Sequence, residues 1–277
     1  MQVVGPIFEI RALRQKLSDT VGFVPTMGYL HEGHLALVKQ ARIENSVVIV
    51  SIYVNPAQFG PGEDFDAYPR ELNRDLELLR EEGVDIVFVP SDDEMYPPEF
   101  SSWGDVEKVT ERLEGASRPG HFRGVATVVA KLLNIVQPTK AYFGQKDAQK
   151  AAVIKRMVAD LNMGIEIVVV PTVRESDGLA MSSRNIYLSP GERQAATILF
   201  KALILAWRLG QGGEKDAEKI RRQMTLLIQK ELLAQIDYVS IADADTLEEL
   251  NLIDRPALAS LAVRIGKTRL IDNMLLE

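Results

Sequence analysis

The sequence predicts an α/β protein, with a parallel sheet in its N-terminal part and a smaller α+β domain after it. Up to about residue 170, short runs rich in β-branched residues alternate with segments of helical periodicity. This order favours a parallel sheet with helices on its faces. From about residue 175 the pattern changes to two helical segments followed by three strand candidates, which is typical of a small α+β domain. We expect the domains to cover residues 1–175 and 176–277.

The N-terminal strands are predicted by short runs of buried, β-branched residues. The clearest is VVIVSIYV at 47–54. An apolar run with almost no alternation suits a central strand that is covered on both faces. The other expected strands are 21–24, 84–89, 140–143 and 165–170.

The helices between these strands are predicted by apolar residues at three- and four-residue spacing. In the segment 71–82, Leu72, Leu76 and Leu79 form such a stripe among charged residues, and Gly83 is placed to end the helix. Further helices are expected around 35–42, at 125–136 and at about 147–161.

The C-terminal domain is predicted to open with a capped helix. Ser189, Pro190 and Glu192 occupy the positions of an N-cap, a first helical residue and the acidic partner in a capping box. We expect this helix to reach about residue 209, with a break at 210–213 and a second helix to about residue 234. Short strands are expected at 237–241, 257–263 and 268–273.

The composition excludes several classes of site. The 277 residues include no cysteine and three histidines, which excludes disulfide scaffolds, thiolate zinc sites, iron–sulfur clusters and thiol nucleophiles. With 32 basic and 39 acidic side chains the net charge is −7, which argues against a general nucleic-acid binder. The N-terminus lacks a signal-peptide pattern, and no apolar run approaches the ~20 residues of a membrane span. We therefore expect a cytoplasmic protein with no membrane or nucleic-acid partner.

The first candidate site follows the first expected strand, in the sequence PTMGYLHEGH at 25–34. Glycines 28 and 33 leave room for a ligand, and the start of a helix offers N–H groups and partial positive charge to phosphates. His31 and His34 are three residues apart, so they lie on one side of a helical turn where both can donate to phosphate oxygens. Two ordinary histidines in a surface turn are the alternative. The position at the carboxyl end of a strand favours a ligand site.

The second candidate is the loop GLAMSSRN at 178–185, in the expected link between the domains. Ser182, Ser183 and Arg184 combine two hydroxyls with a guanidinium fork, a set suited to phosphate. On its own, a polar linker with a solvated arginine is the simpler interpretation. A glycine-containing loop between domains could instead close over a bound nucleotide.

The paired HxGH and Met-Ser-Ser-Arg segments resemble the adenylate-forming nucleotidyltransferases, a superfamily that includes class I aminoacyl-tRNA synthetases. Further segments make the chain similar to one family of that group, the pantothenate synthetases (pantoate–β-alanine ligases). These segments are VNPAQF at 54–59, YPR at 68–70, RPGHFRGV at 118–125, FGQKD at 143–147 and RESDGLAMSSRN at 174–185. The resemblance implies a Rossmann-like sheet in the N-terminal domain, with the Met-Ser-Ser-Arg loop at the start of the C-terminal one.

The resemblance implies a two-step reaction. The pantoate carboxylate attacks the α-phosphate of ATP and pyrophosphate leaves. The β-alanine amine then attacks the acyl carbon of the pantoyl adenylate, and AMP leaves. Because an anion must approach a polyanion, Mg²⁺ and cationic donors are expected, with no metal ligand assigned to a protein side chain. A homodimer is also implied.

The functional positions of the family correspond to specific residues of this chain. The implied catalytic residues, as stabilisers of phosphate charge, are His31, His34, Lys146 and Arg184. The implied ATP contacts are Met27, Gly28, Tyr29, Leu30, His31, Glu32, Gly33, His34, Gly144, Gln145, Lys146, Asp147, Val173, Met181, Ser182, Ser183 and Arg184. The implied pantoate and β-alanine contacts are Asn55, Gln58, Tyr68, Val128, Val129 and Lys150.

Some positions have a simpler interpretation. Val128 and Val129 fit a helix core equally well, and His121 is more typical of a packed residue than of a catalyst. Arg118 could meet a carboxylate, although an exposed arginine is the common case. Where the family usually has a second glutamine that contacts pantoate, this chain has Lys150. Its ammonium either faces pantoate or swings to solvent.

Other functions stay open on the sequence alone. Another nucleotidyltransferase would keep the HxGH site but would have no need of the Gln58 and RPGHF segments. A fragment of a tRNA synthetase would be expected to carry a basic extension. A nucleotide sensor without turnover would have no need to retain all four of the implied catalytic residues.

Overall fold

The computed structural model describes residues 1–276, and the chain divides into two compact units. The first unit comprises residues 1–144 and 150–171, and the second comprises residues 145–149 and the chain from 172 onward. The short piece 145–149 therefore belongs with the C-terminal part of the chain, although it follows a strand of the first unit. A division into domains at 175/176 stays a prediction.

Six parallel strands form the sheet of the first unit, in the order β1-β4-β3-β2-β5-β6. Their bounds are β1 (Gln2–Val4), β2 (Val21–Thr26), β3 (Val47–Ile52), β4 (Ile86–Phe88), β5 (Lys140–Gly144) and β6 (Glu166–Val170). The predicted parallel sheet is confirmed. The edge strand β1 was not expected, because three residues are too few to show a period.

Four helices of this part of the chain match predicted segments, and three others, at 7–14, 92–95 and 114–117, were not predicted. The helices are α1 (Ile7–Arg14), α2 (Glu32–Glu44), α3 (Leu72–Glu81), α4 (Asp92–Met95), α5 (Glu114–Ser117), α6 (His121–Val136) and α7 (Ala148–Asp160), with 3-10 turns η1 (Pro56–Gln58) and η2 (Gln145–Asp147). Gly83 ends the α3 region as predicted, with a φ of +73°. The α6 helix begins four residues earlier than expected, at His121, so the RPGHF segment forms a helix start.

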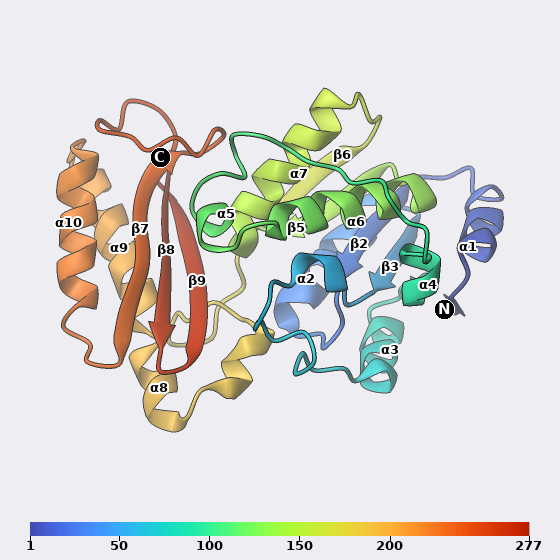
Figure 1. Cartoon of the computed structure of the whole chain (residues 1–277), viewed down its shortest axis with the longest axis horizontal. Helices are drawn as coiled ribbons and strands as arrows, with labels where there is room; N and C mark the ends of the chain where they lie inside the picture. Colours follow the sequence, from blue (N-terminus) through green and yellow to red (C-terminus); the bar gives the residue numbers. More distant parts are fainter. Residues whose placement is uncertain (277) are drawn as a thin grey trace. The chain divides into compact units, whose positions relative to one another are not determined.

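Alternate residues of the strands belong to two different core clusters. Figure 1 shows the helices that surround this sheet. Phe23 and Ile49 belong to a core cluster shared with α1, α6 and α7. Val24 and Val50 belong to a second cluster shared with α2 and α3. Since both faces are covered, the central strands need apolar residues at every position, which explains the unbroken run in β3.

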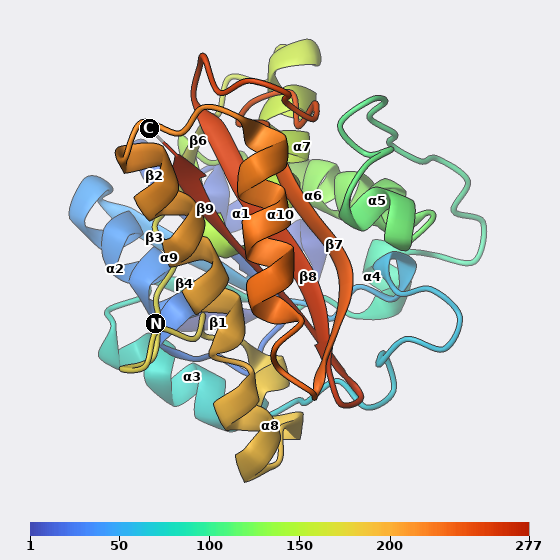
Figure 2. The ribbon, with the colours of Figure 1, turned by 90° about the vertical axis from the view of Figure 1, so that its left-hand side faces the viewer.

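The second unit is an antiparallel sheet with helices on one face, which confirms the predicted small α+β fold. Its strands are β7 (Ala234–Asp243), β8 (Ala257–Ile265) and β9 (Thr268–Leu276), in that order. Its helices are α8 (Pro190–Ala195), α9 (Ile198–Gln211) and α10 (Ala217–Ile228), with the 3-10 segment η3 (Ser183–Tyr187) before them. Figure 2 shows α9 and α10 side by side over the sheet, where they share one apolar core cluster with it.

Two predicted helix bounds in this unit are wrong. The capping box of Ser189 and Glu192 is present, but the helix it opens ends at Ala195 and α9 is a separate helix. The hydroxyl of Thr197 donates to the carbonyl of Gln194 at 2.8 Å, which tightens the turn between the two. The second helix was expected to reach residue 234 but ends at Ile228. Leu232 is 96% exposed, so it adds nothing to an apolar helix face.

Candidate active site

The candidate segments begin where the central strands of the six-stranded sheet end. β2 ends at Thr26 and leads into the HxGH segment, β3 ends at Ile52 before Asn55 and Gln58, and β5 ends at Gly144 before Lys146. β2 lies between β3 and β5, so the chain leaves β2 toward one side and later returns to the other. Such a switch point at the carboxyl edge is where open α/β sheets bind ligands.

The compact units divide the predicted site residues into two groups. The first unit holds Met27, Gly28, Tyr29, Leu30, His31, Glu32, Gly33, His34, Asn55, Gln58, Tyr68, Val128, Val129, Gly144 and Lys150. The second unit holds Gln145, Lys146, Asp147, Val173, Met181, Ser182, Ser183 and Arg184.

A buried carboxylate of α3 holds the turn that follows β2. Gly28 and Tyr29 have φ angles of +78° and +49°, in the left-handed region. Asp75 Oδ2 accepts the backbone N–H of Tyr29 at 2.7 Å, and its Oδ1 accepts the N–H of Leu30 at 2.8 Å. The Asp75 side chain is 1% exposed. Burial raises the pKa of Asp75, and the two backbone hydrogen bonds oppose the rise.

The structure gives a different reason for glycine at position 28 from the room for a ligand that the sequence suggested. A Cβ at Gly28 would lie 3.0 Å from Asp75 Oδ2, so the turn itself requires glycine, whether or not a ligand approaches. Arg74 completes the support, since its Nη1 donates to the carbonyl of Leu30 at 3.0 Å and its guanidinium lies 5.5 Å from the centre of the Tyr29 ring. Sequence reasoning missed Asp75, which looks like one of many charged residues on a predicted amphipathic helix.

His31 and His34 cap the start of α2 with their rings together. His31 is the N-cap residue, and its Nδ1 accepts the backbone N–H of Gly33 at 3.1 Å. The backbone N–H of His31 in turn donates to Nδ1 of His34 at 3.4 Å. The ring centroids are 4.1 Å apart. A neutral imidazole whose Nδ1 accepts a hydrogen bond carries its hydrogen on Nε2, so both rings present an Nε2–H donor beside a helix N-terminus.

Asn55 and Gln58 meet Met27 beside the start of α6. The Asn55 amide donates to Gln58 Oε1 and to the carbonyl of Gly124, each at 3.2 Å, and its Oδ1 accepts the Tyr96 hydroxyl at 2.8 Å. Gln58 Nε2 lies 2.9 Å from the sulfur of Met27. A Cβ at Gly124 would lie 2.1 Å from the carbonyl oxygen of Ala57, so this close approach of α6 to η1 requires glycine.

The predicted pocket walls are buried. Tyr68 packs edge-on to Phe59, with ring centroids 6.0 Å apart. Val128 and Val129 belong to the core cluster of the first unit, which agrees with their alternative interpretation as helix core. The role of all three as pantoate contacts stays a prediction.

Arg118 and His121 brace the Gln58 backbone from the start of α6. Arg118 forms a two-point ion pair with Glu63, at 2.7 and 2.6 Å, and its Nη1 lies 3.1 Å from Nε2 of His121. His121 Nδ1 lies 2.7 Å from the carbonyl oxygen of Gln58, so it carries the donated hydrogen there. Of the two possibilities for Arg118, contact with a carboxylate is confirmed and the exposed arginine is wrong, because a carboxylate 55 residues earlier in the chain pairs with it.

Protonation of His121 is expected to destabilise the fold. Burial, together with the Arg118 guanidinium, lowers the pKa of His121 to about 4, whereas an unfolded chain protonates histidine near pH 6.5. Between these values the unfolded chain binds a proton that the native chain does not, so the free energy of unfolding falls as the pH drops from about 6.5 toward 4. Denaturant unfolding at about pH 7 and about pH 5 should show the wild type losing about 2 kcal/mol more than a His121→Gln variant. Equal losses would contradict this assignment.

The second group lies on the unit formed by the C-terminal part of the chain. Lys146 and Asp147 lie in η2, with Lys146 Nζ 3.6 Å from a carboxylate oxygen of Asp147. In the loop, the backbone N–H of Met181 donates to the carbonyl of Val173 at 3.0 Å. The Ser182 hydroxyl caps η3 by accepting the N–H of Arg184 at 3.3 Å. These bonds hold the loop in a defined turn, and its role at the phosphates stays a prediction.

Residues 1–276 lack two kinds of feature. They contain no group of three histidine, aspartate or glutamate side chains placed to hold a metal ion. No helix in the same residues combines the length and apolarity needed to cross a membrane.

Comparison with known proteins places the chain in one family. The profile of the family described as pantoate-beta-alanine ligase matches residues 2–275. Proteins named pantothenate synthetase from Roseiflexus castenholzii and Herpetosiphon aurantiacus are 59% and 60% identical, with 100% of each chain covered. The crystal structure of pantothenate synthetase from Thermus thermophilus matches with a TM-score of 0.95 at 48% identity and 99% coverage of both chains.

A further solved structure carries ligands in its description. The pantoate-beta-alanine ligase of Francisella tularensis, described as complexed with beta-gamma ATP and beta-alanine, matches with a TM-score of 0.81 at 36% identity, covering 99% of this chain and 97% of that one. Sequence profile, full-length relatives and solved structures agree. The chain therefore belongs to the pantoate-beta-alanine ligase family and is a ligase.

Proposed function

We propose that this ligase forms pantothenate from pantoate and β-alanine through a pantoyl-adenylate intermediate. A carboxylate oxygen of pantoate attacks the α-phosphorus of ATP, and the bond from that phosphorus to the bridging oxygen breaks to release pyrophosphate. The β-alanine amine then attacks the acyl carbon, loses a proton, and displaces AMP. Family membership supports the overall reaction, and the Francisella relative with beta-gamma ATP and beta-alanine supports both substrates.

The observation that carries the proposal is the imidazole pair at the start of α2. Both Nδ1 atoms are occupied by backbone N–H groups, so both Nε2–H groups are directed to other acceptors. Adenylation moves negative charge onto the departing pyrophosphate, and two fixed donors beside a helix N-terminus stabilise such charge. His31 and His34 act here as electrostatic stabilisers. Pyrophosphate departure does not require a proton from either ring.

Lys146 and Arg184 are proposed to supply the remaining positive charge. Both are candidates for contacts with the phosphates of ATP, Arg184 through its guanidinium fork. Asp147 is proposed to accept ribose hydroxyls. Mg²⁺ is proposed to enter with ATP, because this ion prefers phosphate oxygens and retained waters.

Pantoate is proposed to bind at Gln58. The current partner of Gln58 Nε2 is the thioether of Met27, which is a weak acceptor. A carboxylate or hydroxyl oxygen would be a better acceptor for that amide hydrogen. The bonds from Asn55 and His121 hold the rest of Gln58 in place, so the exchange needs no backbone movement.

Lys150 is proposed to face the same substrate. Its ammonium is among the charges that lower the pKa of His121, whose ring contacts the Gln58 backbone. Replacement Lys150→Gln should therefore change the KM for pantoate by more than about twofold, with a smaller change in the KM for ATP. Steady-state kinetics with each substrate varied in turn would measure both. A pantoate KM within about twofold of the wild type would contradict direct contact.

Product analysis tests the proposed route. The complete reaction should yield AMP and pyrophosphate in equal amounts with pantothenate, and omission of any one substrate should abolish pantothenate. Formation of ADP and phosphate would instead indicate an acyl-phosphate intermediate. An ATP-binding protein without turnover would give no AMP at all. The family resemblance also implies a homodimer, which sedimentation analysis would test.

A further inference from the structure

Two buried polar residues stand side by side on the last strand of the chain. Asp272 and Asn273 of β9 are 2% and 5% exposed, although they lie outside every motif that pointed to ATP. Buried polar side chains are costly unless fully hydrogen-bonded. Their partners therefore show what the two residues do.

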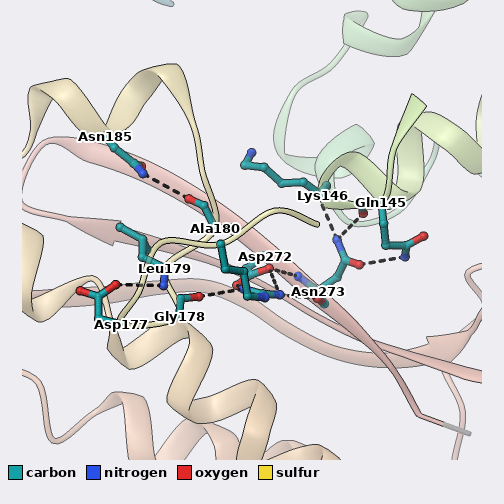
Figure 3. A network of polar contacts seen from close by, with 10 residues as sticks. Gln145, Lys146, Asp177, Gly178, Leu179, Ala180, Asn185, Asp272 and Asn273 are labelled. Carbon is teal, nitrogen blue, oxygen red and sulfur yellow. Dashed lines mark hydrogen bonds and ion pairs between the residues drawn. The ribbon is translucent and has the colours of Figure 1, made fainter. Parts of the chain in front are cut away.

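Asn273 holds the backbone of the segment 145–147 (Figure 3). Its side-chain nitrogen donates to the carbonyl of Gln145 at 2.9 Å and to that of Lys146 at 3.0 Å. Its Oδ1 accepts from Gln145 Nε2 at 2.9 Å. Both amide hydrogens and the amide oxygen are thus used on two consecutive residues. Figure 3 shows the Lys146 side chain pointing away from that of Gln145, so Asn273 anchors the backbone of Lys146 and leaves its ammonium directed elsewhere.

Asp272 holds the neighbouring loop through Arg174. The guanidinium of Arg174 donates to Oδ2 and Oδ1 of Asp272 at 2.6 and 3.0 Å. It also donates to the carbonyls of Gly178 and Asn273, at 3.0 and 3.3 Å. Asp272 Oδ1 accepts the backbone N–H of Asn273 at 2.8 Å as well. Paired, two-point contacts of this kind fix orientation as well as position.

The loop held in this way leads directly into the Met-Ser-Ser-Arg run. Arg174 pairs with Ala180 across the turn, and its guanidinium lies 4.6 Å from the centre of the Phe200 ring. Gly178 has a φ of +92°, and a Cβ there would lie 1.9 Å from that ring. The residue after Ala180 is Met181, so the position of the run is set by the Arg174 turn.

We propose that Asn273 and Asp272 are positioning residues that fix the two nucleotide segments, 145–147 and 173–184, relative to each other. One strand thereby holds the backbone of Lys146 on one side and the loop of Arg184 on the other. This inference rests on the proposed function, because it takes both segments to contact ATP. Cationic groups lower a transition state only when held at the right place, and displacements of about 1 Å cost activity.

Three substitutions distinguish a positioning role of Asn273 and Asp272 from a contribution to folding alone. Asn273→Asp keeps the size of the side chain but sets a carboxylate oxygen against two carbonyl oxygens. Asn273→Ser keeps a single hydroxyl donor. Asp272→Asn removes the charge that pairs with Arg174. Asp237→Asn is the control, because it makes the same chemical change on a residue that pairs with Arg269 at 2.6 Å in the same sheet and belongs to neither segment.

The readouts are the KM for ATP, kcat, and the affinity for a non-hydrolysable ATP analogue measured by calorimetry. We expect Asn273→Asp and Asp272→Asn to weaken analogue binding and raise the KM for ATP by at least about tenfold, Asn273→Ser to lie between them and the wild type, and the control to stay within about twofold. A purely structural role would lower the active fraction, and so kcat, without moving the KM for ATP or the affinity of the folded protein. That result would overturn the inference.

The calorimetry also separates this inference from the proposed function. If the wild type makes pantothenate and the folded variants bind the analogue as it does, only the positioning role fails. A wild type that makes no AMP from ATP and pantoate refutes the proposed function itself. Thermal unfolding of each variant, with Asn273→Ser as the mildest change, ensures that affinities are compared between folded proteins.

Discussion

Replacement of His34 by alanine is expected to lower kcat/KM by at least ~10²-fold, the usual effect of removing one transition-state donor. The His34 ring has two functions that the structure separates. Nδ1 accepts the backbone N–H of His31 and so helps to cap α2. Nε2 carries the hydrogen proposed to stabilise the departing pyrophosphate.

Two further variants assign the effect to one ring nitrogen. His34→Asn places an oxygen near the Nδ1 position and can keep the cap, but it has no donor at Nε2, so it should be as slow as the alanine variant. His34→Gln places an amide nitrogen near the Nε2 position and should recover part of the rate. Steady-state kinetics at saturating pantoate would measure all three. Full activity in His34→Asn would show that His34 only caps the helix.

Removal of the Asp75 carboxylate should have the next largest effect. Asp75→Ala leaves the buried N–H groups of Tyr29 and Leu30 without acceptors, and each buried unsatisfied group costs about 1–3 kcal/mol. For two such groups the free energy of unfolding should therefore fall by about 2–6 kcal/mol. Because the turn carries the start of the HxGH segment, kcat/KM should also fall, by about tenfold or more.

The isosteric change Asp75→Asn sharpens this test. The asparagine keeps one acceptor oxygen and turns an NH₂ group toward the other backbone N–H, so it should still raise the KM for ATP. Glu77→Gln is the control, because it makes the same chemical change on an exposed position of the same helix. Chemical denaturation and ATP kinetics would be measured for all three variants. If Asp75→Asn had the same free energy of unfolding and the same KM for ATP as the control, the turn would not depend on the carboxylate.

The sequence predicted local features better than long-range ones. The spacing of His31 and His34 correctly placed them at one helix start, because capping involves residues three apart. The apolar run of β3 correctly indicated a doubly covered strand. Short elements such as β1 were not predicted, because three residues are too few to show a periodic pattern.

The supporting residues could not be predicted, because their partners are distant in the chain. Asp75 meets a turn 45 residues earlier, and Asn273 meets a segment 128 residues earlier. The pattern of a single sequence does not show which distant residues pair. It gave one signal, that Asp272 and Asn273 would need partners. Asp272 and Asn273 interrupt an apolar run expected to be a strand, and buried polar residues in such a place usually have specific partners.

The most direct test of the account is exchange of labelled pyrophosphate into ATP, catalysed by the wild-type protein without β-alanine. The proposed adenylate predicts exchange that requires pantoate, because pyrophosphate can re-form ATP only from a pantoyl adenylate held on the enzyme. Addition of β-alanine should divert that intermediate to pantothenate and AMP. Exchange that proceeds without pantoate, or none in its presence while pantothenate is still made from all three substrates, would contradict the adenylate route.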